Sequence, residues 1–187
     1  MLISAVIPAA GLSQRMGSAK TTLTTEKKLT FAGHLVDVFT AFGCNPVIMV
    51  VNEEFNPATC PTGDAIIVLN RRLDKGRSWS ILLGLKRVPE YHACFIQNVD
   101  NPFLELSLLE VLAGAVTGNS HVMPIFQGHG GHPLLLGSEV VDHLRNMDEL
   151  PDFRQELKSF AGYKIPYHDE RILLNINTPA DYRAYIG

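Results

Sequence analysis

Apolar positions along this chain fall into two alternating patterns. Short, nearly continuous apolar runs predict buried strands, and they lie at residues 2–8, 46–51, 65–69, 93–99 and 121–126, with shorter runs at 134–136 and 172–174. Helical spacing of apolar residues predicts helices at 29–42, 78–87, 105–116, 139–146, 153–160 and 179–185. A nearly continuous apolar run indicates a strand that is buried on both faces of its sheet. Such strands alternating with helices predict an α/β fold, in which a mostly parallel sheet has helices on both faces.

Length and composition fit one folded domain. The chain has 187 residues, of which 46% are hydrophobic and 19% charged, so it is long enough to bury a sizeable core. No internal repeat, low-complexity segment or long linker divides it, and the least regular stretch is the loop at 52–63. We therefore expect a single domain over residues 1–187.

The net charge and the cysteines indicate which kind of ligand the protein binds and in which compartment it is expected. The net charge of −3 gives no basic surface for nucleic acid, which favours a small-molecule ligand. Cys44, Cys60 and Cys94 have no metal-binding or redox spacing, so we expect free thiols in a reducing compartment. Signal-peptide features are absent, and no apolar run approaches the roughly 18 residues of a membrane span. The expected location is the cytoplasm, with no membrane partner.

The loop after the first predicted strand carries residues suited to a triphosphate. In the stretch "IPAAGLSQRMGSAK", which starts at Ile7, Gly11 and Gly17 allow the backbone to approach an anion closely. Arg15 and Lys20 add positive charge where phosphate oxygens would lie. Ligands of parallel α/β sheets bind at the carboxyl ends of the strands, so this loop is a candidate nucleotide site.

Two other phosphate-binding motifs do not fit this loop. The P-loop pattern GxxxxGK[ST] requires glycine where Ala19 precedes Lys20, and its first glycine position holds Gln14. The dinucleotide pattern GxGxxG is absent as well. Taken by itself, the stretch also fits a plain surface loop with solvated cations.

Five stretches in order along nearly the whole chain resemble the MobA-like nucleotidyltransferases. They are "AAGLSQRMGSAK" at 9–20, which matches AAGxSxRMGxxK, "GRSWSILLGL" at 76–85, "FIQNVDNPFL" at 95–104, "GHGGHPLLLG" at 128–137 and "NINTPADY" at 175–182. The family includes the enzymes that attach GMP or CMP to molybdopterin. The chain is more loosely similar to the sugar-1-phosphate nucleotidyltransferases.

This resemblance implies a fold, an activity and a cofactor. The implied fold is a Rossmann-like sheet of the nucleotide-diphospho-sugar transferase, GT-A type. The implied activity is a Mg²⁺-dependent transfer of NMP from CTP or GTP to a phosphorylated acceptor, such as molybdopterin, with release of pyrophosphate. In that reaction Lys20 and Arg15 would offset charge that shifts toward the leaving group.

The resemblance also implies site residues. The catalytic residues would be Arg15, Lys20 and Asp100. The nucleotide-binding residues would be Ala9, Ala10, Gly11, Ser13, Arg15, Lys20, Asn70, Ser78, Ser80 and Gly84, and the acceptor-binding residues would be Gly131, His132 and Pro133. The chain departs from the family at Trp79, where a smaller residue is common, and at Asn101, where glutamine is frequent.

Candidate metal ligands come at the ends of two predicted strands. Asp100 follows the strand at 93–99, so its carboxylate is expected at the carboxyl edge, where it would bind Mg²⁺. The alternative is a turn residue before Pro102. Asn175 is the expected second ligand, with a helix cap or turn as its alternative and with Asn177 two residues away. The histidines lack the compact ligand set that zinc requires.

The sequence contains no nucleophile-and-base arrangement, which agrees with catalysis by positioning and electrostatics. Three other functions stay open: transfer to a sugar phosphate or other small phosphate, a catalytically inactive nucleotide-binding regulatory protein, and a phosphate-binding partner module. The sequence does not choose between GTP and CTP, name the acceptor or give the oligomeric state.

Overall fold

The computed structural model describes residues 1–12, 16, 20–26 and 28–186, and its described strands form one sheet. The strand order is β3-β2-β1-β4-β7-β5-β6, with β8 paired to β5. The strands are β1 Ile3–Pro8, β2 Val47–Val51, β3 Ile66–Leu69, β4 Ala93–Ile96, β5 Ser120–Phe126, β6 His129–Gly130, β7 Leu134–Leu136 and β8 Ala161–Pro166. The α-helices are α1 Phe31–Phe42, α2 Gly76–Leu85, α3 Leu106–Ala115, α4 Ser138–Arg145, α5 Phe153–Leu157 and α6 Pro179–Ile186. Short 3₁₀ helices are η1 Lys20–Thr22, η2 Leu73–Lys75 and η3 Glu170–Leu173.

The sheet is mostly parallel, as the sequence predicts. Strands β3, β2, β1 and β4 pair in parallel. Strand β7 is antiparallel to both β4 and β5, so β5 has the same direction as β4, and β8 is parallel to β5. The carboxyl ends of the four parallel strands therefore meet at one edge, where the candidate site lies.

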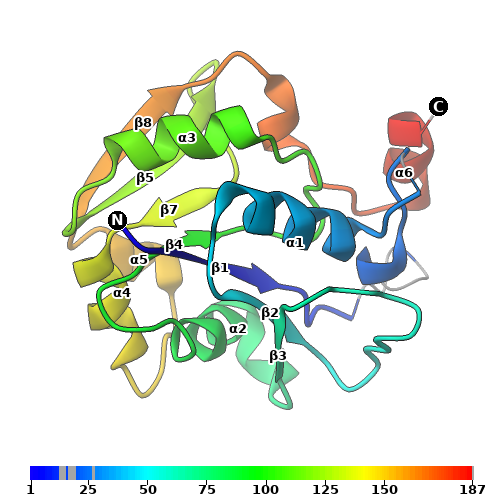
Figure 1. The fold of residues 1–187 in the computed structure, drawn as a ribbon, viewed down its shortest axis with the longest axis horizontal. Coiled ribbons are helices and arrows are strands. Elements are labelled where there is room, and N and C mark those ends of the chain that lie inside the picture. The colour runs from blue at the N-terminus through cyan, green and yellow to red at the C-terminus, as the bar shows by residue number, and fades with distance from the viewer. Residues whose placement is uncertain (13–15, 17–19, 27, 187) are drawn as a thin grey trace.

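Helices cover both faces of this sheet, which explains why its central strands are apolar throughout. On β1, Ala5 and Ile7 belong to the core beneath α1 and α3, whereas Val6 between them belongs to the core beneath α2 and α4. The same alternation holds on β2 and β4, because successive side chains of a strand point to opposite faces. Figure 1 shows α1 and α3 on one side of the sheet and α2 and α4 on the other.

Two elements near the C-terminus differ from the sequence prediction. The strand expected at 172–174 is absent, and η3 takes its place, with the Asp169 side chain accepting a hydrogen bond from the Arg171 amide (2.9 Å). Strand β8 was not predicted, because five of its six residues are exposed and show no apolar alternation. It forms by pairing with β5 along six residue pairs.

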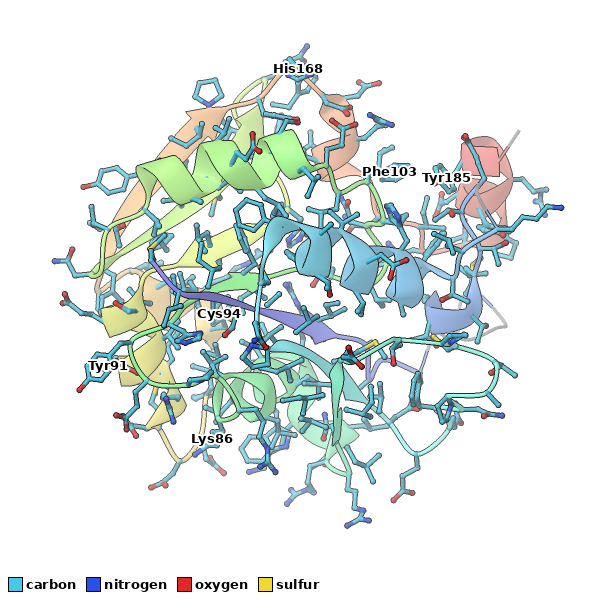
Figure 2. The ribbon with its side chains drawn as sticks, viewed as in Figure 1. Lys86, Tyr91, Cys94, Phe103, His168 and Tyr185 are labelled. Carbon is cyan, nitrogen blue, oxygen red and sulfur yellow. The ribbon has the colours of Figure 1, made fainter. Side chains whose placement is uncertain are left out.

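The three cysteines are buried free thiols, as expected. Burial raises the pKa of Cys44 to about 12. Figure 2 shows Cys94 in the interior, whereas Lys86 and Tyr91 project outward. Among the described helices, none combines the length and apolar character needed to cross a membrane.

Candidate active site

A cleft of about 850 Å³ opens at the carboxyl ends of β1, β2, β3 and β4. It is lined by residues of the loop after β1, by residues that follow the other three strands, by the start of α2 and by one residue before α6. The described lining residues are Pro8, Ala9, Ala10, Gly11, Leu12, Lys20, Thr21, Asn52, Glu54, Phe55, Asn70, Leu73, Gly76, Arg77, Ser80, Asn98, Val99, Asp100 and Asn177. We call this space the nucleotide cleft.

An asparagine follows each of the strands β2, β3 and β4 and lines the nucleotide cleft. The Asn52 side chain donates to the Ala10 carbonyl (3.3 Å), which ties the loop after β1 to the end of β2. Asn70 is buried and donates to Ser80 Oγ (2.9 Å). Asn98 bonds to His132 Nε2 (3.0 Å). These amides hold the neighbouring segments in place around the cleft, and the sequence analysis identified only Asn70 among them.

The charged centre of the cleft joins three segments that are far apart in the sequence. Lys20 Nζ lies 2.9 Å from Asp100 Oδ2 and 2.6 Å from Asn177 Oδ1. The side chains of Lys20 and Asp100 are only 16% and 20% exposed, so water screens their attraction less than it screens a surface pair. Asp100 therefore lies at the carboxyl edge of the sheet, as expected from the sequence, and contacts Lys20 of the segment after β1.

Local contacts fix the backbone that carries Lys20. Lys20 begins η1, and the next carbonyl, that of Thr21, accepts a hydrogen bond from the buried Cys60 thiol (3.3 Å). Further along, the Tyr182 hydroxyl donates to the Thr24 carbonyl (3.0 Å). These contacts attach the segment to the loop at 52–63 and to α6.

The C-terminal segment is fixed by contacts at both of its ends. The Ile176 amide donates to the Asp100 carbonyl (2.7 Å), and the buried Asn101 side chain donates to the carbonyls of Arg171 and Ile172 (3.2 and 3.0 Å). Phe103 also stacks edge-on against Tyr185 of α6, with ring centroids 4.6 Å apart (Figure 2). The loop after β4 therefore carries both Asp100 and the tether that brings the C-terminal segment to it.

A capping arrangement at the start of α6 then orients Asn177. Asp181 Oδ2 accepts from the amides of Asn177 and Thr178 (3.0 and 2.8 Å), while Thr178 Oγ1 accepts from the Asp181 amide (3.2 Å). The Asn175 side chain is exposed and donates to the Leu173 carbonyl (3.2 Å). Asn177, two residues after the expected metal ligand Asn175, therefore contacts Lys20 together with Asp100.

One carboxylate oxygen of Asp100 is buried without a hydrogen-bond donor among the described residues. This atom is Oδ1, whereas Oδ2 receives the Lys20 ammonium. A buried carboxylate oxygen without a donor is costly, and a cation would satisfy it. Within the described part of the chain, no three His, Cys, Asp or Glu side chains gather into a metal-binding group. A metal at Asp100 would therefore need Asn177, water and ligand oxygens as its further partners.

Two residues expected at the nucleotide do not line the cleft. Ser78 Oγ accepts a hydrogen bond from the Phe153 amide (3.3 Å), which attaches α5 to the start of α2. Gly84 packs α2 against the sheet, since an added Cβ would lie 2.4 Å from Val6 Cγ1. The hydrophobic contact between helix and sheet explains the glycine without a ligand.

Arg77 is a cleft residue that the sequence analysis missed. Helix α2 begins at Gly76, two residues earlier than predicted, so Arg77 lies in its first turn. Its side chain is exposed and forms no ion pair or hydrogen bond with the described residues. Desolvation by the surrounding protein lowers the pKa of Arg77, the Asp100 carboxylate raises it and the Arg154 guanidinium lowers it.

The expected acceptor residues lie next to the cleft rather than in its lining. Gly131 packs on Ile172, where a Cβ would come within 2.7 Å of the side chain, and Pro133 is buried. His132 contacts the cleft residue Asn98, and its Nδ1 atom is buried without a partner among the described residues. The pKa of His132 is lowered to about 4, mainly by burial and also by the charges of Arg77 and Arg154, while Asp100 acts to raise it. His132 is therefore neutral at pH 7.

This neutral histidine predicts a loss of stability in acid. The unfolded chain takes up the proton near pH 6.5 and the folded chain only near pH 4, so acid favours unfolding between these values. From ~1.4 kcal/mol per pH unit, the penalty from His132 at pH 5 is about 2 kcal/mol. We expect the unfolding free energy of His132→Gln to fall less than that of the wild type between pH 7.5 and pH 5 in urea titrations. Equal losses in the two proteins would contradict the buried neutral state.

Ser13 and Arg15, expected to bind the nucleotide, lie outside the described residues. Of the other residues expected there, Ala9, Ala10, Gly11, Lys20, Asn70 and Ser80 all line the cleft, together with Asp100.

Comparisons with known proteins agree with this arrangement. The model of the MobA-like NTP transferase domain matches residues 5–163. The molybdenum cofactor cytidylyltransferase of Escherichia coli K12 is 24% identical over 183 residues, which cover 96% of this chain and 93% of that protein. The crystal structure of Rv0371c from Mycobacterium tuberculosis H37Rv has a TM-score of 0.83 and 20% identity to this chain. The match covers 100% of this chain and 97% of Rv0371c. Rv0371c has also been solved in complex with manganese. A nucleotidyl transferase from Methanothermobacter has a TM-score of 0.80 at 22% identity, covering 98% and 95% of the two chains.

The structural likenesses, all below 25% identity, establish the fold, and the family match reaches from β1 into β8. The matched region contains both Lys20 and Asp100, which form the ion pair at the centre of the nucleotide cleft. The chain therefore belongs to the MobA-like NTP transferase family and is a nucleotidyltransferase.

Proposed function

We propose that this enzyme transfers NMP from CTP or GTP to a phosphorylated small-molecule acceptor, with Mg²⁺ as cofactor and pyrophosphate as the second product. The observation that carries the proposal is the meeting of Lys20, Asp100 and Asn177 in one cleft at the carboxyl edge of the sheet. This centre combines one cation for phosphate oxygens with two oxygen ligands for a metal. The curated relative is a cytidylyltransferase of the molybdenum cofactor, so CTP and molybdopterin are the substrates to test first.

The residues around Asp100 fit a divalent metal. Mg²⁺ prefers oxygen ligands and commonly takes only one or two from the protein, and Asp100 Oδ1 is buried without a donor among the described residues. Asp100 and Asn177 would hold the ion, and the manganese complex of a structural relative agrees with a divalent metal in this fold. Bound there, the ion would neutralise phosphate charge as it develops on the leaving group.

The nucleotide would lie across the ends of the parallel strands. We place the triphosphate at the loop after β1, where the backbone of Ala10 and Gly11 lines the cleft and Lys20 provides the charge. The base would lie toward Asn70 and Ser80, whose mutual hydrogen bond holds two polar side chains at that wall. Both groups are buried, so they would present a fixed polar surface to the base.

The reaction requires no covalent intermediate with the enzyme. An acceptor phosphate oxygen would attack the α-phosphorus of the NTP, and the bond from that phosphorus to the bridging oxygen would break, leaving pyrophosphate with the electron pair. Lys20 would offset charge on the triphosphate oxygens, and Asp100 would hold Lys20 in position until substrate binds. Catalysis of this kind depends on positioning and charge and needs no nucleophile-and-base pair in the protein.

Binding and turnover with the four NTPs test this function. A nucleotide at 100 times its dissociation constant should stabilise the fold by about 2.7 kcal/mol, so CTP or GTP with Mg²⁺ should raise the melting temperature more than ATP or UTP. Pyrophosphate release should then require an added acceptor, with molybdopterin and sugar 1-phosphates as separate arms. Failure of all four NTPs to stabilise the protein would overturn the proposal, and turnover with sugar 1-phosphates alone would move it to a different acceptor.

A pair of alanine variants tests the choice of Asn177 over Asn175. Asn177→Ala should raise the Mg²⁺ concentration for half-maximal activity several-fold, because it removes an oxygen proposed as ligand. Asn175→Ala should leave it within about twofold, because that side chain is exposed and bonds only to backbone. Titration of Mn²⁺ in the presence of CTP, followed by electron paramagnetic resonance, measures the same difference without turnover. A larger effect at Asn175 would reverse the assignment.

A further inference from the structure

The Tyr182 hydroxyl of α6 bonds to a single residue of the segment that carries Lys20. It donates to the Thr24 carbonyl (3.0 Å), accepts from the Thr24 amide (3.3 Å) and lies 3.1 Å from Thr24 Oγ1. A phenol hydroxyl has one proton to donate and two lone pairs, so these three contacts use its full hydrogen-bonding capacity. Figure 1 shows α6 at the periphery of the molecule, beside the segment that follows β1. The hydroxyl therefore fixes the position of α6 against one short stretch of backbone.

Backbone contacts anchor the same stretch to the body of the protein. The Leu23 amide donates to the Lys20 carbonyl (3.4 Å), and the Leu23 carbonyl accepts from the amide of Phe31 in α1 (2.7 Å). These bonds hold the backbone between Lys20 and Thr24 without any contribution from α6. Lys20 thus has an anchor of its own on α1.

Tyr182 is also linked to Asn177, at the other end of the same contacts. The Tyr182 amide donates to the Thr178 carbonyl (3.1 Å), and the neighbouring Asp181 carboxylate accepts from the amides of Asn177 and Thr178. Asn177 Oδ1 in turn lies 2.6 Å from Lys20 Nζ. The contacts form a closed ring, which leaves Lys20 along the backbone, crosses to α6 at the Tyr182 hydroxyl and returns to Lys20 at Asn177.

The hydroxyl contributes direction to a small packing area. Four residues of α6 are exposed: Pro179, Ala180, Arg183 and Ala184. Two tyrosine rings provide much of its packing, since the rings of Tyr182 and Tyr185 lie against Phe31 with centroids 6.1 and 6.0 Å apart. Ring contacts tolerate small shifts of a helix, whereas hydrogen bonds have narrow limits of distance and angle.

We propose that Tyr182 is a positioning residue of the active site, whose hydroxyl holds Asn177 Oδ1 beside Lys20 and Asp100. Its effect on catalysis rests on the proposed function, in which Asn177 is a metal ligand. The bond from the Ile176 amide to the Asp100 carbonyl (2.7 Å) keeps the chain near the site, so loss of the hydroxyl should misorient Asn177 and not detach it. Metal binding should weaken as a result, while Lys20, with its own anchor, keeps its contacts with the triphosphate.

Hydrogen exchange tests the coupling in the absence of ligands. Tyr182→Phe keeps the ring and deletes the three contacts of the hydroxyl, so the amides of Asn177 and Thr178 should exchange at least fivefold faster in NMR measurements. Tyr185→Phe is the matched control, because Tyr185 packs on the same Phe31 ring and its hydroxyl bonds to none of the described residues. Its amides should exchange as in the wild type, and melting temperatures of both variants control for folding. Unchanged exchange at Asn177 in Tyr182→Phe would overturn the inference.

Metal and nucleotide measurements separate positioning from a general loss of structure. Outer partners of metal ligands typically contribute about 10–100-fold in metal affinity, and Tyr182 acts one contact further out. We therefore expect Tyr182→Phe to lower the Mn²⁺ affinity at least threefold in electron paramagnetic resonance titrations with CTP or GTP, whichever the wild type binds. Turnover should fall by a similar factor at limiting Mg²⁺ and return to within twofold of the wild type at saturating Mg²⁺. Metal-free nucleotide affinity should stay within twofold.

The same measurements define the contrary outcomes. An equal loss of nucleotide affinity with and without metal would overturn the inference, because Tyr182 would then support the whole site. Faster exchange at Asn177 with unchanged Mn²⁺ affinity would also overturn it and leave the nucleotidyltransferase proposal standing. Faster exchange in a protein that binds neither nucleotide nor Mn²⁺ would keep the coupling of Tyr182 to Asn177 and remove the proposed function.

Discussion

Replacing Lys20 with methionine is expected to lower NMP transfer roughly 10²–10³-fold, the range found when one group that stabilises transition-state charge is removed. Methionine keeps much of the length of the side chain and deletes the charge. Lys20 lies where the loop after β1 meets Asp100, so no other described cation of that loop can replace it. Turnover and nucleotide affinity should fall together, because the ammonium would contact triphosphate oxygens before and during transfer.

The same variant should bind a free divalent metal more tightly than the wild type. Without nucleotide, the Lys20 ammonium lies 2.9 Å from Asp100 Oδ2 and 2.6 Å from Asn177 Oδ1, the two residues proposed as metal ligands. A metal entering that position meets a positive charge that has to move away. Mn²⁺ titration of nucleotide-free Lys20→Met, followed by electron paramagnetic resonance, should therefore give a lower dissociation constant.

Lys158→Met serves as the control for charge, because Lys158 is exposed and bonds only to the Gln155 side chain (2.8 Å). It should match the wild type in turnover and in Mn²⁺ affinity. If Lys20→Met also matches the wild type in turnover, Lys20 is a structural partner of Asp100 and not a phosphate ligand. If turnover falls and Mn²⁺ affinity stays unchanged, the metal does not use the oxygens that Lys20 occupies.

The central part of the fold follows from the hydrophobic pattern alone. Strands β1, β2 and β4 are buried on both faces, and only an unbroken apolar run satisfies that environment. Strand β8 could not be predicted in this way, because its side chains are mostly exposed and its stability comes from backbone pairing with β5. At 172–174, by contrast, the apolar residues predicted a strand that does not form. Ile172 is buried against Gly131, but the backbone there is a 3₁₀ helix.

The order of elements was enough to bring Lys20 and Asp100 together. Both residues follow parallel strands that are neighbours in the sheet, so their loops share one edge. The proposal of Asn177 in place of Asn175 as a metal ligand rests on the structure, because it depends on the capping of α6 by Asp181 and on the tether from Asn101. The Asn101 tether joins residues that are distant in the sequence, so no local pattern encodes it, whereas the cap by Asp181 spans only four residues.

The sequence analysis did not identify Arg77 as a cleft residue, and it predicted the start of α2 two residues too late. The predicted helix starts at residue 78, so Arg77 falls just before it, and the sequence analysis gave no role to this arginine of the stretch at 76–85. The observed start at Gly76 puts Arg77 in the first turn of α2, where it lines the cleft. An error of two residues in a helix boundary was therefore enough to hide a cleft residue.

Replacing Asp100 with asparagine is expected to lower turnover by roughly 10³-fold at limiting Mg²⁺, with partial recovery as Mg²⁺ is raised. Asparagine keeps the size of the side chain but loses the negative charge, and hard cations favour carboxylates. One carboxylate oxygen, Oδ1, is buried without a partner among the described residues, so the loss should fall mainly on the metal. Mg²⁺-dependent CTP binding should weaken by an order of magnitude or more.

Binding of CTP without metal separates a metal ligand from a residue that only shapes the turn before Pro102. Removing the Asp100 charge leaves Lys20 and Arg77 less neutralised, so Asp100→Asn should bind metal-free CTP as tightly as the wild type or more tightly. A residue that only shapes the turn would, when replaced, weaken CTP binding with and without metal alike and lower the melting temperature. Asp74→Asn is the matched control, since Asp74 is exposed and pairs with Arg72 outside the cleft lining. Calorimetric titration of CTP with and without Mg²⁺ therefore decides the role of Asp100: equal losses in the two titrations would remove it from the metal site, whereas a loss confined to the Mg²⁺ titration is the expected result.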